Sequence, residues 1–77
     1  MRIEIGDVLR LSHESSGIKP GIYVLIHIEG VTALLCRAGE DDNGDVCTTD
    51  RLLSTNVYNL CAFRSMNMRL ELNSQAE

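Results

Sequence analysis

The chain has 77 residues, enough for one small domain with a single hydrophobic core, and this length excludes a second domain. Seven Lys and Arg against eleven Asp and Glu give a net charge of −4, which argues against the broad basic face that direct nucleic-acid binding needs. The aromatic residues are Tyr23, Tyr58 and Phe63, too few for a base-stacking platform or an aromatic peptide groove.

The N-terminus and the cysteines indicate a cytoplasmic protein. Charged residues interrupt the apolar N-terminal segment, so it does not have the pattern of a signal peptide. The longest apolar run, Ile22–Ile28, is too short to cross a bilayer. Cys36, Cys47 and Cys61 are widely spaced and odd in number, which predicts reduced thiols packed as small hydrophobes rather than a zinc site shared with His27.

Glycines separate short runs of Ile, Val, Leu and Thr along the first half of the chain, a pattern typical of an all-β meander. We expect a first strand at Val8–Leu11 and a polar loop at His13–Pro20. A second strand at Ile22–Ile28 and a third at Val31–Ala38 follow. Between these two, Glu29-Gly30 indicates a two-residue hairpin turn.

This turn predicts the register of the second and third strands. One face carries three apolar pairs: Ile28 with Val31, Ile26 with Ala33, and Val24 with Leu35. The opposite face carries Leu25 with Leu34, Tyr23 with Cys36, and His27 with Thr32. Both faces are therefore apolar, and a one-residue slip would exchange them without changing that. The second face needs a cover, which can be the C-terminal half of the chain, a second copy or another partner.

The second turn is expected at Asp42-Asn43-Gly44-Asp45, because Asn-Gly is the preferred pair of type I′ turns. Its register places Arg37 opposite Asp50 as a cross-strand ion pair and makes Val46–Thr49 a short fourth strand. Asp50 can then cap a brief helical turn near residues 50–54.

The last third of the chain begins with Asn56–Ala62, which is compatible with a further strand. Beyond it, Met66, Met68, Leu70 and Leu72 alternate with Asn67, Arg69 and Glu71. This period of two predicts a final strand with one buried face. Residues 74–77 are expected to form a polar tail, which leaves residues 1–73 as a single small β domain.

The run Gly6-Asp7-Val8-Leu9-Arg10-Leu11, with the polar loop, the two tight turns and the helical turn after it, resembles a Src-homology-3-like small β-barrel. The resemblance covers most of residues 6–60 and concerns the fold alone. It implies an all-β domain of five or six strands, as a barrel or meander. Peptide-binding members of that family line a groove with aromatic residues, and nucleic-acid-binding barrels carry basic loops. Neither feature occurs here, so both activities are disfavoured.

Two polar clusters could carry chemistry. His13-Glu14-Ser15-Ser16 combines an imidazole, a carboxylate and two hydroxyls, but it has no nucleophile elbow and no oxyanion hole, so a solvated loop is expected. Glu40–Asp45 resembles a calcium loop, but Gly39 stands where the first carboxylate ligand belongs and Asp50 stands where a bidentate Glu is expected. No phosphate-binding glycine motif occurs. We expect no enzyme, no metal and no cofactor.

The two-sided apolar hairpin predicts a non-enzymatic protein-protein interaction module, a homodimer without a membrane partner. Its expected interface lies on the second face: Tyr23, Leu25, His27, Leu34 and Cys36. The alternative is a small acidic inhibitor or accessory protein that docks on a basic nucleic-acid-binding site of a larger enzyme through Glu40, Asp41, Asp42 and Asp45. Salt distinguishes the two, because an apolar dimer is nearly indifferent to ionic strength and an acidic complex is not. A small enzyme using His13 or His27 is a third, weaker hypothesis.

Overall fold

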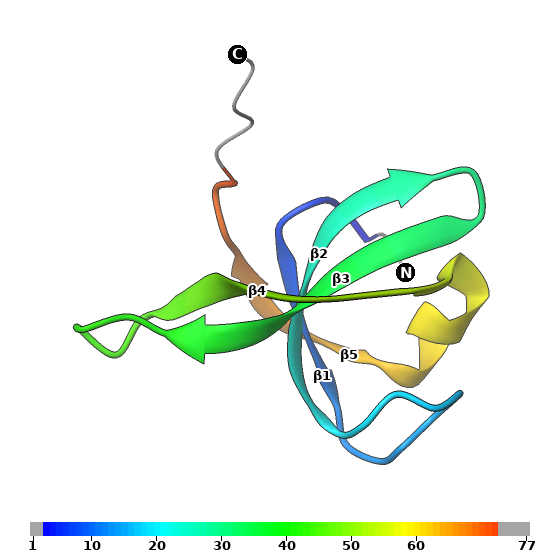
Figure 1. Cartoon of the computed structure of the whole chain (residues 1–77), viewed down its shortest axis with the longest axis horizontal. Helices are drawn as coiled ribbons and strands as arrows, with labels where there is room; N and C mark the ends of the chain where they lie inside the picture. Colours follow the sequence, from blue (N-terminus) through cyan, green and yellow to red (C-terminus); the bar gives the residue numbers. More distant parts are fainter. Residues whose placement is uncertain (1–2, 73–77) are drawn as a thin grey trace.

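A computed structural model describes residues 3–72 as five antiparallel strands and one 3₁₀ helix (Figure 1). In chain order these are β1 (Asp7–Leu11), β2 (Gly21–Glu29), β3 (Thr32–Glu40), β4 (Val46–Asn56), η1 (Val57–Ala62) and β5 (Arg64–Arg69). They form one sheet in the order β4-β3-β2-β1-β5. The predicted all-β class is confirmed. No ladder joins β4 to β5 within residues 3–72, so the sheet is open at these two edges.

The β1–β2 loop is held against the sheet by a small turn of its own. Ser15 and Ile18 exchange two backbone hydrogen bonds, N–H to C=O, of 3.1 and 2.8 Å, and Ser16 and Gly17 between them both have positive φ, of 54° and 80°. Positive φ at both central residues is typical of a type I′ turn. Ile18 is buried in the core and anchors the loop there. The predicted first strand and polar loop are thus confirmed.

The β2–β3 hairpin is shifted from its predicted register. Its turn is Gly30-Val31, so that Glu29 lies opposite Thr32 and Ile28 opposite Ala33. Gly30 has a φ of 62°, as the first central position of a type II′ turn requires, whereas the predicted turn placed this glycine second. The expected pairing of Ile28 with Val31 is therefore wrong.

A β-bulge at Ile26 sets which side chains of this hairpin share a face. Beyond the bulge, Leu25 lies opposite Leu35 and Val24 opposite Cys36. The main core cluster contains Leu9, Leu11, Ile18, Tyr23, Leu25, Ala33, Leu35, Leu60 and Phe63. A smaller cluster on the other side of the sheet contains Val8, Val24 and Cys36. The prediction that both faces are apolar holds, but Tyr23 and Cys36 belong to opposite faces.

The chain itself covers both faces of the hairpin. Leu53 of β4 and Val57 and Leu60 of η1 pack on the main cluster, together with Phe63. Met66 and Leu70, in and just after β5, pack on the smaller cluster. Of the covers considered from the sequence, the C-terminal half of the chain is the one seen.

The β3–β4 turn differs from the predicted Asn-Gly type I′ turn. Asp41 and Asp45 pair across a three-residue loop. The Asp41 N–H donates a hydrogen bond of 2.9 Å to the Asp45 carbonyl, and the Gly44 N–H donates one of 2.9 Å to the Asp41 carbonyl. Gly44 follows with a φ of 83°. This is a type I turn closed by a left-handed glycine. The Asp41 carboxylate stabilises it by accepting hydrogen bonds from the Asn43 and Asp45 N–H groups, each 2.9 Å.

Beyond the turn, β4 continues without a helical break to Asn56 and pairs with β3 along its length, apart from a register shift opposite Arg37. The expected helical turn near residues 50–54 is wrong, because Leu52 and Leu53 pair with Cys36 and Leu35 of β3. Arg37 does lie opposite the stretch that contains Asp50, between the Cys36–Leu52 and Ala38–Thr48 pairs, but the expected ion pair between them is not found in the described residues. The segment predicted as an ambiguous strand is instead η1. Asn56 caps it by accepting a hydrogen bond of 2.9 Å from the Tyr58 N–H.

In β5 the predicted alternation of buried and exposed residues breaks at Asn67, whose φ is 56°. The register against β1 shifts at this point, and Ser65 Oγ accepts a hydrogen bond of 3.0 Å from the Asn67 N–H. As a result Met68 is exposed, while Met66 and Leu70 remain partly buried. The predicted polar tail, residues 74–77, lies outside the described residues.

Candidate functional site: a basic groove beside β4

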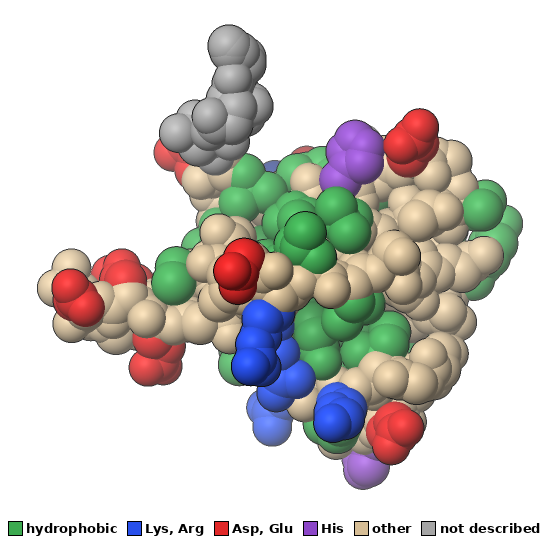
Figure 2. Space-filling model, viewed as in Figure 1, with side chains coloured by type: hydrophobic (Ala, Val, Ile, Leu, Met, Phe, Trp, Pro, Cys, Tyr) green, Lys and Arg blue, Asp and Glu red, His purple; other side chains and the backbone are tan. Residues whose placement is uncertain are grey.

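A groove of about 390 Å³ lies between the β1–β2 loop and β4, within the size range of ligand pockets. We call it the basic groove and define it by its cations Lys19, Arg37 and Arg51, its hydroxyl residues Ser16, Tyr23 and Ser54, and its apolar residues Ile18, Leu52 and Leu53. Figure 2 shows basic side chains gathered between the projecting hairpin and the β1–β2 loop, with hydrophobic side chains among them. Three of the seven Lys and Arg residues of the chain thus meet here, and no Asp or Glu lines the groove.

Tyr23 connects the groove to the core. Its hydroxyl donates a hydrogen bond of 2.7 Å to the Lys19 carbonyl and accepts one of 3.1 Å from Arg37 Nη1. Its ring packs edge-on against Phe63, with 5.8 Å between ring centroids. One buried side chain therefore fixes the loop that carries Lys19, and the guanidinium of Arg37, relative to the sheet.

Arg37 reaches the groove because of an irregularity in the sheet. It lies where the β3–β4 register shifts, and such bulges redirect side chains. Its guanidinium lies 5.4 Å from the centroid of the Tyr23 ring, within the range of a cation–π contact. It also lies against Gly21, where a Cβ atom would come within 2.7 Å of Arg37 Nη2. Apart from the bond to Tyr23, the guanidinium forms no hydrogen bond or ion pair with residues 3–72, so most of its five N–H donors remain for a ligand.

Arg51 belongs to the same irregular stretch of β4. The Thr49 hydroxyl donates a 2.6 Å hydrogen bond to the Arg37 carbonyl and accepts one of 3.2 Å from the Arg51 N–H, which ties the two backbones together. The side chains of Arg51 and Lys19 form no ion pair within the part of the chain that the structure describes. Both residues are exposed. The groove thus presents three cationic side chains, none of which forms an ion pair with an acid of the described chain.

The groove runs along an open edge of the sheet. Arg51–Ser54 line it consecutively, and β4 pairs with β3 on its inner side only in the described chain. An edge strand presents backbone N–H and C=O groups to solvent, where another chain can pair with them. Backbone hydrogen bonds can therefore add to the attraction of the three cations.

The interface residues predicted from the sequence do not form one exposed surface. Tyr23, Leu25 and Cys36 are at most 2% exposed, because the chain covers them itself. His27 is exposed and Leu34 half-buried, and they line a separate hollow of about 410 Å³. Only Tyr23 contributes to the basic groove, through its hydroxyl.

The predicted acidic patch is brought together by the structure. Glu40, Asp41, Asp42 and Asp45 are all exposed at the tip of the β3–β4 hairpin. The hairpin projects from the body of the molecule, and acidic side chains surround its tip (left in Figures 1 and 2). Asp41 is partly engaged in holding the turn.

The other polar clusters are not organised for chemistry. His13, Glu14 and Ser15 line a hollow of about 390 Å³ with Arg64, and no hydrogen bond between these side chains is found in the described residues. Among residues 3–72 no group of three or more His, Cys, Asp or Glu residues is arranged to hold a metal ion. The described chain also contains no helix with the length and apolarity to span a membrane.

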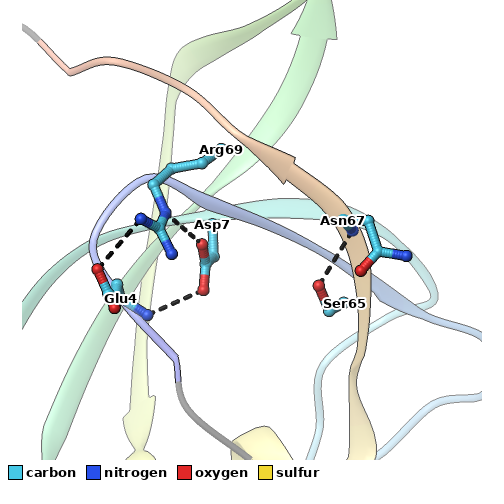
Figure 3. Close-up of polar contacts among 5 residues, drawn as sticks. All are labelled: Glu4, Asp7, Ser65, Asn67 and Arg69. Carbon is cyan, nitrogen blue, oxygen red and sulfur yellow. Dashed lines mark hydrogen bonds and ion pairs between the residues drawn. The ribbon is translucent and has the colours of Figure 1, made fainter.

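Asp7, the one buried acid among the described residues, links β1 to β5 (Figure 3). Its carboxylate accepts hydrogen bonds of 2.9 Å from Arg69 Nε and from the Glu4 N–H, while Arg69 Nη1 lies 3.2 Å from the Glu4 carboxylate. Burial raises the pKa of Asp7, but the two hydrogen bonds and the charge of Arg69 together outweigh it and hold the pKa below its ordinary value. These contacts join β5 to the start of β1.

This lowered pKa predicts how stability depends on acid. The unfolded chain binds a proton at Asp7 more readily than the folded chain, so this link stabilises the fold fully above about pH 4 and its contribution is lost as the pH falls through the lowered pKa. We expect Asp7→Asn to lower the free energy of unfolding at pH 7 by about 1 kcal/mol and to flatten its decline between pH 4 and pH 2. Urea unfolding followed by circular dichroism at several pH values measures both effects. Asp42→Asn, at the exposed tip, is the control and should keep the wild-type pH dependence.

Comparison with known proteins gives no relationship: no protein-family model, curated protein or solved structure matches the chain. The groove therefore has to be interpreted from its own chemistry.

Proposed function

We propose that the protein is a non-enzymatic protein-interaction module that binds an acidic segment of a partner protein in the basic groove. The observation that carries this proposal is the meeting of Lys19, Arg37 and Arg51 beside an open sheet edge, with no ion pair to an acid of residues 3–72. Carboxylates form their strongest hydrogen bonds with such cations, and a guanidinium can hold a carboxylate through two bonds.

The groove also offers apolar contact and a fixed shape. Leu52 is 57% exposed, and with the partly buried Leu53 it provides an apolar strip next to the cations. Arg37 is already oriented by Tyr23, so a ligand loses less entropy in ordering it. These features favour a peptide segment with acidic and apolar residues over a free inorganic anion.

The proposal also extends to the type of all-β fold. The five-stranded order with a 3₁₀ helix before the last strand supports an open Src-homology-3-like small barrel. The three free cysteines support the expected reducing, cytoplasmic setting.

A peptide titration tests the function. A ten-residue peptide that alternates Glu and Asp with Val should shift the amide NMR signals of Gly17, Arg51 and Ser54, and raising NaCl from 50 to 300 mM should weaken its binding by about tenfold or more. Lys19→Gln with Arg51→Gln should also cost about tenfold in affinity, since two charge-assisted contacts are lost. Arg64→Gln, which removes a cation outside the groove, is the matched control and should bind as wild type does.

Two results would contradict the proposal. One is an unchanged affinity in the Lys19→Gln, Arg51→Gln variant. The other is equal binding of a peptide in which Lys replaces every acid.

A second candidate rests on the acidic tip. Its projection from the body, with four exposed acids, supports docking of the tip on a basic surface of another protein. Neutralising the tip acids would abolish that interaction and leave peptide binding in the groove intact, which separates the two functions.

A further inference from the structure

We infer that the acidic segment bound by the basic groove is the hairpin tip of a second copy of this chain, so that two copies dock reciprocally. The inference rests on the proposed function of the groove and adds the identity of its occupant. The tip carries Glu40, Asp41, Asp42 and Asp45, and the groove carries three cations. The chain thus contains both a cationic site and an acidic segment of matching charge.

The tip cannot reach the groove of its own chain. Asp45 and Arg51 lie on the same arm of one hairpin, and the matching stretch of β3, from Glu40 opposite Val46 to Cys36 opposite Leu52, is about 13 Å along an extended strand. The paired β3 and β4 hold the tip away from the body (Figure 1). The attraction between tip and groove therefore needs a second molecule, and a second copy of the chain supplies a tip of matching charge.

The common location of tip and groove on one hairpin favours a closed pair. When two such hairpins lie antiparallel and side by side, each tip comes next to the groove of the other copy. Both contacts then form together, related by a twofold axis, and the assembly ends at two copies. The open edge of β4, with no proline between Val46 and Asn56, leaves space for this approach.

Neutralising the charges of the tip, or those of the groove, tests the inference. The tip variant combines Glu40→Gln, Asp42→Asn and Asp45→Asn, and it keeps Asp41 because that carboxylate holds the turn. The groove variant combines Lys19→Gln and Arg51→Gln. Sedimentation velocity in 20 mM NaCl should show wild type as a dimer that dissociates in 500 mM NaCl. Each variant alone should lose about tenfold or more in association constant.

Mixing the two variants gives the decisive result. The tip variant keeps an intact groove and the groove variant an intact tip, so an equimolar mixture should associate more strongly than either variant alone. Each variant alone, at the total concentration of the mixture, should not show this increase in association. Circular dichroism of each variant establishes that it is folded.

Three outcomes would overturn the inference. The first is a wild-type monomer at 100 µM in 20 mM NaCl, and the second is a dimer that neither salt nor the variants weaken. The third is a mixture that behaves as the sum of its parts. If one of these occurs while the acidic peptide still binds through Lys19 and Arg51, the groove accepts an acidic segment of a different protein. If the peptide does not bind either, the proposed function itself is wrong.

Discussion

Replacing Leu35 with Ala should lower the free energy of unfolding by about 2–5 kcal/mol, the largest loss we expect from a single side chain. Leu35 is fully buried at the centre of β3, between Leu25 of β2 and Leu53 of β4. Truncation removes apolar contacts and leaves a cavity that these neighbours cannot fill, because the paired strands hold their backbones in place. In a domain of this size such a loss is a large share of the total stability, so the variant should be only marginally folded at 25 °C.

Guanidinium denaturation followed by far-UV circular dichroism measures the effect, since the chain contains no Trp to report by fluorescence. Leu52→Ala is the matched control: the same truncation on the adjacent strand, at a residue 57% exposed, should cost less than about 1 kcal/mol. Similar losses for the two variants would mean that the core does not lie between β2, β3 and β4.

Gly6→Ala should destabilise the fold by about 3 kcal/mol or more, although it adds a single methyl group. Gly6 has a φ of 96°, which a residue with a Cβ atom rarely adopts. Its added Cβ would also overlap the backbone carbonyl of Leu70. Here the Leu70 N–H donates a 2.8 Å hydrogen bond to the Gly6 carbonyl, and the Gly6 N–H donates one of 2.7 Å to Leu25. The chain cannot relieve the overlap without breaking one of these bonds.

Gly17→Ala separates the two causes. Gly17 also has a positive φ, of 80°, but an added Cβ would meet nothing within 4 Å, so only the conformational cost of about 1 kcal/mol remains. Denaturation compares the two variants. Hydrogen exchange of the Leu70 amide gives an independent readout, because Gly6→Ala should remove its protection and Gly17→Ala should not. Equal costs for the two substitutions would mean that Leu70 does not pack against Gly6.

Local sequence patterns were sufficient to predict the all-β class, the first three strands and the presence of apolar residues on both faces. Alternation and glycine spacing are properties of a few neighbouring residues, and nothing elsewhere in the fold opposes them here. The registers could not be predicted because each depends on one turn. Gly30 fits the first position of a type II′ turn as well as the second of another type, and the Asp41 carboxylate selects a three-residue loop over the Asn-Gly pair.

The predicted helical turn failed for a different reason. Asp50 is a favourable N-cap, but the pairing of Leu52 and Leu53 with β3 determines the structure of that segment. The cap occurs instead at Asn56, the last residue of β4. Tertiary packing thus moved the helical turn by about six residues from its predicted position.

The basic groove was not predicted, because its cations lie far apart in sequence and the net charge is negative. Lys19 comes from a loop, Arg37 from β3 and Arg51 from β4. One signal was available: the predicted hairpin already placed Arg37 opposite Asp50, the neighbour of Arg51, so two cations had to be close in any similar register. The position of Lys19 could not be inferred, since it depends on the Tyr23 hydroxyl and on the burial of Ile18.

The hydroxyl of Tyr23 has a consequence for how partners of this protein can be found. It joins the interior, where the ring packs on Phe63, to the rim of the groove, where it holds Lys19 and Arg37. A ligand that occupies the groove therefore restrains a side chain on which the interior depends, and binding raises the melting temperature of the whole domain through mass action. At a hundredfold excess over its dissociation constant, such a ligand adds about 2.7 kcal/mol to stability. A melting curve can thus serve as the screen for partners of this protein, without a label and before any partner has been identified.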